Sequence, residues 1–171
     1  MRILTVIIAI MGLTACLGMP EKVTPIKSFE LSRYLGKWYE IARLDHSFER
    51  GLEKVSAEYS LMDDGGVSVL NRGYSLEDAK WKEANGKAYF VNDSDEGYLK
   101  VSFFGPFYGS YVIFEIEREN YEYAFVSGPN KSYLWLLART PDLTKNKIEK
   151  FIKRSEELGF NTDDLIFVNH K

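Results

Sequence analysis

The sequence predicts an all-β protein: an eight-stranded antiparallel up-and-down β-barrel with one C-terminal α-helix packed outside and a short final strand. Three observations favour this fold class. Segments rich in aromatic and β-branched residues recur at roughly even spacing, with Gly, Pro, Asn and Asp between them. Aromatic residues make up 15% of the 171-residue chain, and they favour strands and apolar interiors. Helical spacing occurs in one long stretch only, near the C-terminus.

Strict alternation identifies the strands most clearly in residues 54–62, where apolar residues such as Tyr59 alternate with Ser and Glu. The segment 63–66, Asp-Asp-Gly-Gly, is a strong hairpin signal directly after it. Similar runs follow at regular intervals. The predicted strands are residues 37–44, 54–62, 67–74, 80–91, 98–104, 110–117, 122–127 and 132–139.

Helical spacing places one apolar face on residues 144–158, and Gly159 follows as a helix-ending residue. Asp142 or Thr144 is the candidate N-cap. Because the rest of the chain is β, this helix is expected to cover the outside of the sheet. Residues 29–35 predict one short helical turn that plugs one end of the barrel, and residues 166–168 predict a last short strand.

The N-terminal residues 1–15 are typical of a lipoprotein signal peptide: a basic start, a short apolar run and small residues before Cys16. Cys16 is the predicted lipidation site; the alternative is an ordinary secretory signal with a free cysteine. Residues 16–27 are interpreted as the lipidated cysteine and a tether, and residues 28–171 as the barrel domain. The residue after the cysteine is Leu17 rather than Asp, which favours the outer membrane.

Composition argues against several function classes. A net charge of −3 gives no indication of nucleic-acid binding, and one cysteine permits no internal disulfide. His46 lies beside Asp45, but neighbours in sequence cannot form a catalytic triad. No Cys/His set has metal-ligand spacing. We therefore expect no enzyme, no metal and no cofactor.

Barrel closure connects two distant residues. An eight-stranded up-and-down barrel closes when its first and last strands pair. Trp38 stands at the start of the first strand, just after Gly36, and Arg139 stands at the end of the last. Closure should therefore place the Arg139 guanidinium over the Trp38 indole, in a cation–π contact.

Four segments carry a resemblance to a known family, and they lie at 36–43, 48–55, 103–109 and 133–141. With the helix and short strand that follow, they resemble the lipocalin family, and most closely the bacterial outer-membrane lipoprotein lipocalins related to apolipoprotein D. One departure is Ser132, where many lipocalins carry an acidic residue before the aromatic.

The resemblance implies a carrier of fatty acids or lysophospholipids, anchored to the outer membrane through Cys16, on its periplasmic face, and it leaves a homodimer open. It places the open mouth at loops 45–54, 75–80, 104–110 and 128–132. Arg43, Arg50 and Lys54 are the candidates for meeting an anionic headgroup near the mouth. The candidate cavity residues are Tyr59, Tyr89, Leu99, Val101, Phe103, Tyr111, Ile113 and Trp135.

Two alternatives remain at this point. The aromatic residues could fill the barrel, which would leave a structural or interaction lipoprotein, or the barrel could carry another small hydrophobic ligand. The aromatic loop at 104–108 is interpreted either as a surface that touches membrane or a second protomer, or as a lid over the mouth.

Overall fold

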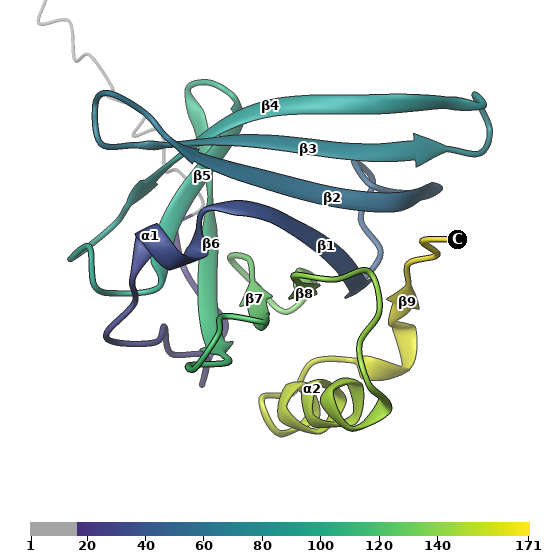
Figure 1. Cartoon of the computed structure of the whole chain (residues 1–171). Coiled ribbons are helices and arrows are strands. Elements are labelled where there is room, and N and C mark those ends of the chain that lie inside the picture. Colours follow the sequence, from purple (N-terminus) through teal and green to yellow (C-terminus); the bar gives the residue numbers. More distant parts are fainter. Residues whose placement is uncertain (1–16) are drawn as a thin grey trace, which may run out of the picture.

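The structure is a computed structural model that describes residues 17–171. The predicted signal peptide and Cys16 lie outside these residues. Figure 1 shows strongly bent strands enclosing one interior, with a helix to one side. The elements are α1 (Leu31–Tyr34), β1 (Gly36–Arg43), β2 (Leu52–Leu61), β3 (Val67–Ser75), β4 (Lys80–Phe90), β5 (Tyr98–Phe104), β6 (Phe107–Ile116), β7 (Tyr123–Ser127), β8 (Leu134–Ala138), α2 (Lys145–Glu157), a 3₁₀ turn (Thr162–Asp164) and β9 (Ile166–Phe167).

Strands β1 to β8 form the closed antiparallel barrel that the sequence predicts. Each strand pairs with the next, and β1 pairs with both β2 and β8. The first half of β1 bonds β2, while its second half bonds β8 on one edge and the short β9 on the other. The extra strand therefore adds to the barrel from outside.

The predicted helix is confirmed as α2, and it covers the outer face of the barrel. The ring of Phe151 lies 5.0 Å from that of Phe125 on β7, edge to face. Thr144 is the N-cap residue but makes no capping side-chain hydrogen bond, and Gly159 ends the helix with a φ of +84°. A second hydrophobic core thus lies under α2, separate from the core inside the barrel.

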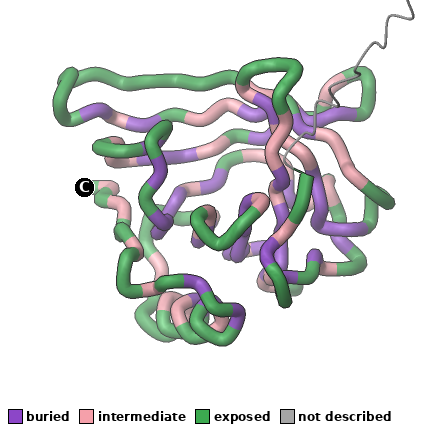
Figure 2. Tube along the Cα trace, turned by 180° about the vertical axis from the view of Figure 1, so that it is seen from behind, coloured by how far each residue is buried: buried purple, intermediate pink, exposed green. Residues whose placement is uncertain are grey.

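Burial follows this arrangement, with buried segments along the strands and exposure at hairpin ends and on the helix surface (Figure 2). The first six residues of β4, Lys80 to Asn85, are all exposed. The β3–β4 hairpin therefore extends beyond the packed body of the barrel.

Helix α1 closes one end of the barrel. Tyr34 is buried there against Trp38, whose indole N–H donates a 2.7 Å hydrogen bond to the Tyr34 carbonyl oxygen. Arg139 lies over the indole, with its guanidinium carbon 3.9 Å from the ring centroid, and donates to the carbonyl oxygens of Lys37 and Arg33 at 2.9 and 2.6 Å. This contact is the one that barrel closure led us to expect. Gly36 has a φ of +91°, which explains why a glycine stands there.

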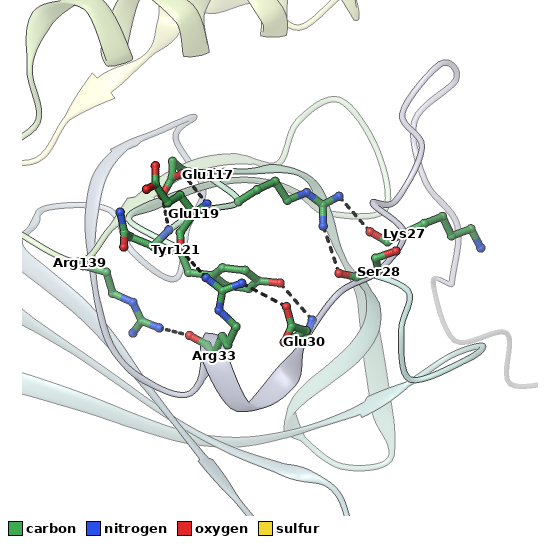
Figure 3. A network of polar contacts seen from close by, with 10 residues as sticks. Lys27, Ser28, Glu30, Arg33, Glu117, Glu119, Tyr121 and Arg139 are labelled. Carbon is green, nitrogen blue, oxygen red and sulfur yellow. Dashed lines mark hydrogen bonds and ion pairs between the residues drawn. The ribbon is translucent and has the colours of Figure 1, made fainter.

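A polar network ties the α1 region to the turn between β6 and β7 (Figure 3). Arg33 donates to the Glu119 carbonyl oxygen at 2.6 Å and stacks over the Tyr121 ring. The Tyr121 hydroxyl accepts a hydrogen bond from the Glu30 amide. Arg118 donates to two carbonyl oxygens of the preceding segment. The closed end is thus fixed by side chains that bond backbone groups of distant segments.

The described part of the predicted tether, residues 17–27, lies against the barrel instead of hanging free. Val23 is buried in the core under α2, and Met19 packs against the same core. Further along, the Ile26 amide donates to the Ile113 carbonyl oxygen at 2.9 Å. The Ile26 carbonyl oxygen accepts a hydrogen bond from the Gly97 amide, so this segment bonds and packs against the folded domain.

Candidate functional site: the barrel cavity

The barrel encloses a cavity of about 360 Å³, which extends from the α1 plug to the loops at the other end. Its wall is mostly apolar, with residues such as Val69 and Leu137 on the strands. Phe48, Pro129 and Tyr133 line it at the open end. A cavity of this size and character is typical of sites for small hydrophobic ligands.

The structure places six of the eight predicted cavity residues on this wall: Tyr59, Leu99, Val101, Phe103, Tyr111 and Trp135. Ile113 is fully buried inside the barrel but is packed into the core and does not line the cavity. Tyr89 was assigned to the wrong face. Its neighbour Ala88 lines the cavity, so alternation turns Tyr89 outward, where its hydroxyl donates to Asp64 at 2.9 Å.

Three tyrosine hydroxyls meet inside the barrel. The Tyr111 hydroxyl lies 2.7 Å from that of Tyr34 and 2.8 Å from that of Tyr59. Burial raises the pKa of all three phenols, well above the usual range for Tyr34 and Tyr111. All three therefore stay neutral and act as hydrogen-bonding groups. Three hydroxyls carry three hydrogens, and the two contacts among them use two, so one donor is left for another acceptor.

A buried ion pair lies farther along β1, toward the open end, where it contacts the β1–β2 loop. Arg43 is 2% exposed and donates to Glu40 Oε1 at 2.7 Å. It also donates to the Glu49 carbonyl oxygen at 3.0 Å, so it holds the β1–β2 loop against β1. Its Nε has no hydrogen-bond partner among residues 17–171.

Glu49 brings a second buried carboxylate to the same place. Its Oε2 accepts a 3.2 Å hydrogen bond from the Trp135 indole. Burial, reinforced by the charge of Glu49, raises the pKa of Glu40 well above its usual range. Burial also raises the pKa of Glu49. Both carboxyl groups line the cavity, and Arg43 pairs with Glu40, so these three residues form a polar patch at a mostly apolar wall.

His46 completes this polar patch. Its Nε2 lies 3.1 Å from Glu49 Oε2, but in the described part of the chain neither ring nitrogen has a partner with hydrogen-bond geometry. The ring stacks on Phe48, with centroids 4.1 Å apart. Burial and the nearby Arg43 lower the pKa of His46 to about 4. The imidazole is therefore neutral at pH 7.

The three cations predicted near the mouth are not available for an anionic headgroup in the expected way. Arg43 is inside the barrel and paired with Glu40. Arg50 is exposed and pairs with Asp45 at 2.7 Å. Lys54 lines a depression that also includes the exposed Trp81, away from the barrel cavity.

A backbone irregularity in β1 explains the correction for Arg43, and a second irregularity lies beside Lys54. Residue 41 is an extra residue in the pairing of β1 with β8, between Glu40 and Ala42, so Arg43 faces the interior together with Glu40. A second irregularity lies between Glu53 and Ser56 on β2, where Lys54 has a φ of +51°.

Sequence reasoning missed Glu40, Glu49 and Tyr34 as cavity residues. A signal for Glu40 was present, because it lies two residues after Trp38 and so shares the inward face of that strand. Glu49 had no such signal, since it comes from a loop. Its position depends on how that loop folds against Arg43.

A barrel of this topology, with an internal cavity and an outer helix, defines the lipocalin class of protein. The family model described as the lipocalin-like domain matches residues 29–170, and the chain therefore belongs to this family.

Among relatives, the chain is 64% identical to "Outer membrane lipoprotein Blc" of Vibrio cholerae, over the full length of both chains. It is 48% identical to "Outer membrane lipoprotein Blc" of Escherichia coli strain K12, covering 87% of this chain and 84% of that one. Mouse apolipoprotein D is 33% identical, covering 71% and 67%. The chain is accordingly a lipocalin lipoprotein of the bacterial outer membrane.

A comparison of structures agrees on the fold. Insecticyanin from the tobacco hornworm Manduca sexta superimposes with a TM-score of 0.71 at 21% identity, covering 90% of this chain and 87% of that chain. Within residues 17–171 no helix is long and apolar enough to cross a membrane. The same residues contain no group of three or more His, Cys, Asp or Glu side chains arranged to hold a metal ion.

Proposed function

We propose that this protein binds and carries a single-chain lipid, a fatty acid or a lysophospholipid, at the outer membrane, anchored on its periplasmic face through acylation of Cys16. The cavity carries this proposal: about 360 Å³ of mostly apolar space between the α1 plug and the loops around Phe48 and Tyr133. This open volume favours a carrier over a filled, structural barrel. Burying a sixteen-carbon chain would gain on the order of 10 kcal/mol before ordering costs.

The polar patch favours a lysophospholipid over a fatty acid. A carboxylate head placed there would face Glu40 and Glu49, and Arg43 already pairs with Glu40. A head whose outer end, beyond the phosphate, bears hydrogen-bond donors or a positive charge suits these acids better, because that end meets acceptors instead of like charge. We therefore expect a lysophospholipid with a donor-bearing head to bind more tightly than palmitate.

We propose a non-catalytic role for the same groups. His46 is kept neutral by burial, and it stacks on Phe48. The acids nearest the cavity are engaged by Arg43 and by the Trp135 indole. These contacts hold the patch in place, so we propose that it recognises the ligand without transforming it.

The test is a titration of the folded chain from Leu17 onward with palmitate and with a lysophospholipid of equal chain length. Trp135 lines the cavity, so its fluorescence should respond to filling. Saturation at about one ligand per barrel supports the carrier. Absence of saturable binding for both lipids contradicts the carrier proposal. That result would favour a structural or interaction lipoprotein instead.

Two variants sharpen the titration. Val101→Trp fills the cavity and should abolish binding, while Lys100→Trp, at the neighbouring position on the outer face of β5, should leave it intact. Glu49→Gln should reduce the preference for lysophospholipid over palmitate. Equal binding of both lipids by the unmodified chain would contradict the headgroup proposal while leaving the carrier standing.

A further inference from the structure

A second depression, with a volume of about 300 Å³, lies on the outside of the barrel over β1, β2 and β3. Tyr39, Ser56 and Arg72 line it, and they stand directly opposite one another on these three strands, so they share one face. Trp38 points into the barrel, so its neighbour Tyr39 faces outward. The floor of this outer depression is therefore the outer surface of the sheet.

The C-terminal tail forms one wall of the outer depression. The Lys54 amide donates a 2.8 Å hydrogen bond to the Asn169 carbonyl oxygen. His170 lines the depression, and its Nε2 lies 2.8 Å from the Glu40 carbonyl oxygen, which can only accept, so Nε2 is the donor. The tail is thus bonded to both β1 and β2, and Figure 1 shows the chain end beside the start of β2.

Positive charge gathers in this depression, although the chain as a whole has a net charge of −3. Lys37, Lys54 and Arg72 line it from three different strands. Arg72 pairs with Glu83 at 2.7 Å. Among residues 17–171 neither lysine forms an ion pair, although Glu58 stands opposite Lys37 on β2. Two of the three charges thus have no carboxylate partner in this part of the chain.

The backbone at Lys54 is unusual for a lysine. Its φ is +51°, a left-handed conformation that is unfavourable for residues with a Cβ and that Gly adopts most easily. Its side chain is half-buried. A glycine would relieve the unfavourable conformation, so a lysine at this position indicates a use for its amine.

An aromatic wall stands beside these charges. Trp81 is 49% exposed, and the Arg72 guanidinium carbon lies 5.3 Å from its ring centre. The Tyr74 ring packs against the indole edge to face, with centroids 5.6 Å apart. These contacts orient the indole and leave much of its surface accessible. An accessible indole next to cations suits a ligand that has a flat ring beside a negative group.

We propose that the outer depression binds a small phosphomonoester, with the phosphate at Lys37 and Lys54 and a flat ring against Trp81. At neutral pH a phosphomonoester carries about two negative charges and several acceptor oxygens, so it can accept from both lysines at once. The volume of about 300 Å³ also leaves room for the ring. Because this site lies outside the barrel cavity, the proposal does not depend on the lipid-carrier function.

The experiment is a calorimetric titration of the full chain in maltoside detergent at constant ionic strength, with phenyl phosphate as the probe. Benzoate carries the same ring with a carboxylate, and glycerophosphocholine is a soluble phosphodiester of the kind found in lipid headgroups. We expect saturation at about one phenyl phosphate per chain, and weaker binding of both control ligands. Absence of saturation, or equal binding of either control ligand, overturns the proposal.

Lys37→Gln and Lys54→Gln should each weaken phenyl phosphate binding by about tenfold, because each removes a charge-assisted hydrogen bond. Lys100→Gln is the matched control and should leave the affinity unchanged. The Lys37 and Lys100 ammonium groups lie 4.7 and 5.2 Å from the centre of a tyrosine ring, but Lys100 is outside the depression. An equal loss in Lys100→Gln would show an effect of overall charge alone and would overturn the site.

Lys54→Gly separates binding from stability. Glycine accommodates the left-handed backbone, so the unfolding midpoint should stay the same or rise while phenyl phosphate binding weakens. If the midpoint and the binding fall together, Lys54 has only a structural role and the proposed contact is wrong.

Val101→Trp, which fills the barrel cavity, should bind phenyl phosphate as the unmodified chain does, provided that its unfolding midpoint shows a folded protein. Loss of binding in that folded variant would place the probe inside the barrel and overturn the outer site. Lipid titration reports on the carrier function separately.

Discussion

The two ends of the barrel are built in different ways. At the closed end, Trp38 is fully buried, and Arg139 and α1 bond backbone groups around it. At the open end, charged groups such as Arg43 and Glu49 are buried beside empty space, and Phe104 and Phe107 face solvent. The closed end is therefore expected to supply stability, and the open end to supply ligand contacts at some cost in stability.

The largest expected effect is at the closed end. Trp38→Ala should lower the free energy of unfolding by about 3–5 kcal/mol, because it removes a fully buried indole and leaves a cavity. Urea denaturation measures this. Trp81→Ala is the control, since Trp81 is 49% exposed, and should cost less than about 1 kcal/mol. Equal losses for both variants would contradict the special role of the closed end.

A pH effect at the open end should come next. The pKa of His46 is lowered from 6.5 to about 4, so His46 adds stability that is present above pH 6.5 and lost as the pH falls through 4. Its full shift corresponds to about 3 kcal/mol, reduced to about 2 kcal/mol by partial hydration.

His46→Gln should reduce this loss of stability at acid pH, measured as unfolding midpoints between pH 7 and 4. Glu40, whose pKa is raised, acts in the opposite sense: its stabilising contribution is present below its ordinary pKa and is lost as the pH rises. Glu40→Gln, which cannot ionise, should therefore lose less stability than the unmodified chain as the pH rises above the ordinary glutamate pKa. If His46→Gln loses as much stability at acid pH as the unmodified chain, burial of this ring is not coupled to stability.

A smaller loss of stability is expected from a substitution at Arg139, which closes the barrel. Arg139→Met removes the stacking on Trp38 and two hydrogen bonds to carbonyl oxygens, and should cost about 1–2 kcal/mol. Arg118→Met is a matched control, because Arg118 also donates to two carbonyl oxygens but is exposed and stacks on no indole. If the control loses as much stability in urea, the stacking contributes nothing.

The smallest effect should come from the tyrosine hydroxyls between the two ends. Tyr111→Phe removes both contacts, to Tyr34 and to Tyr59, and should cost about 1 kcal/mol because two buried hydroxyls lose their partner. Tyr89→Phe, which removes an exposed hydroxyl bonded to Asp64, should be nearly neutral. A stability gain for Tyr111→Phe would mean that the hydroxyls are not satisfied by one another.

Local patterns predicted most of the fold. Alternation in 54–62 and helical spacing in 144–158 both reflect periodicities fixed by backbone geometry, and the structure has β2 and α2 at those places. The contact of Trp38 with Arg139 also followed, because antiparallel closure leaves little choice about which strand ends meet.

The wrong predictions concern strands whose alternation is interrupted, and residues whose inward or outward direction changes with a shift of one position. The extra residue in β1 turned Arg43 inward. On β4, a difference of one position separates the cavity residue Ala88 from Tyr89. A shift of one residue exchanges the two faces of a strand, so small backbone irregularities reassign side chains completely.

The sequence by itself determined the class of fold, the order of its elements and the residues that close the barrel, because these depend on local periodicity and on connection. Only the tertiary structure decided that Glu40, Arg43, His46 and Glu49 meet beside the cavity, and that residues 18–29 lie against the barrel. Those arrangements depend on a bulge and on loop packing. They form from contacts between segments that lie far apart in the sequence, and no local pattern in either segment predicts such a contact.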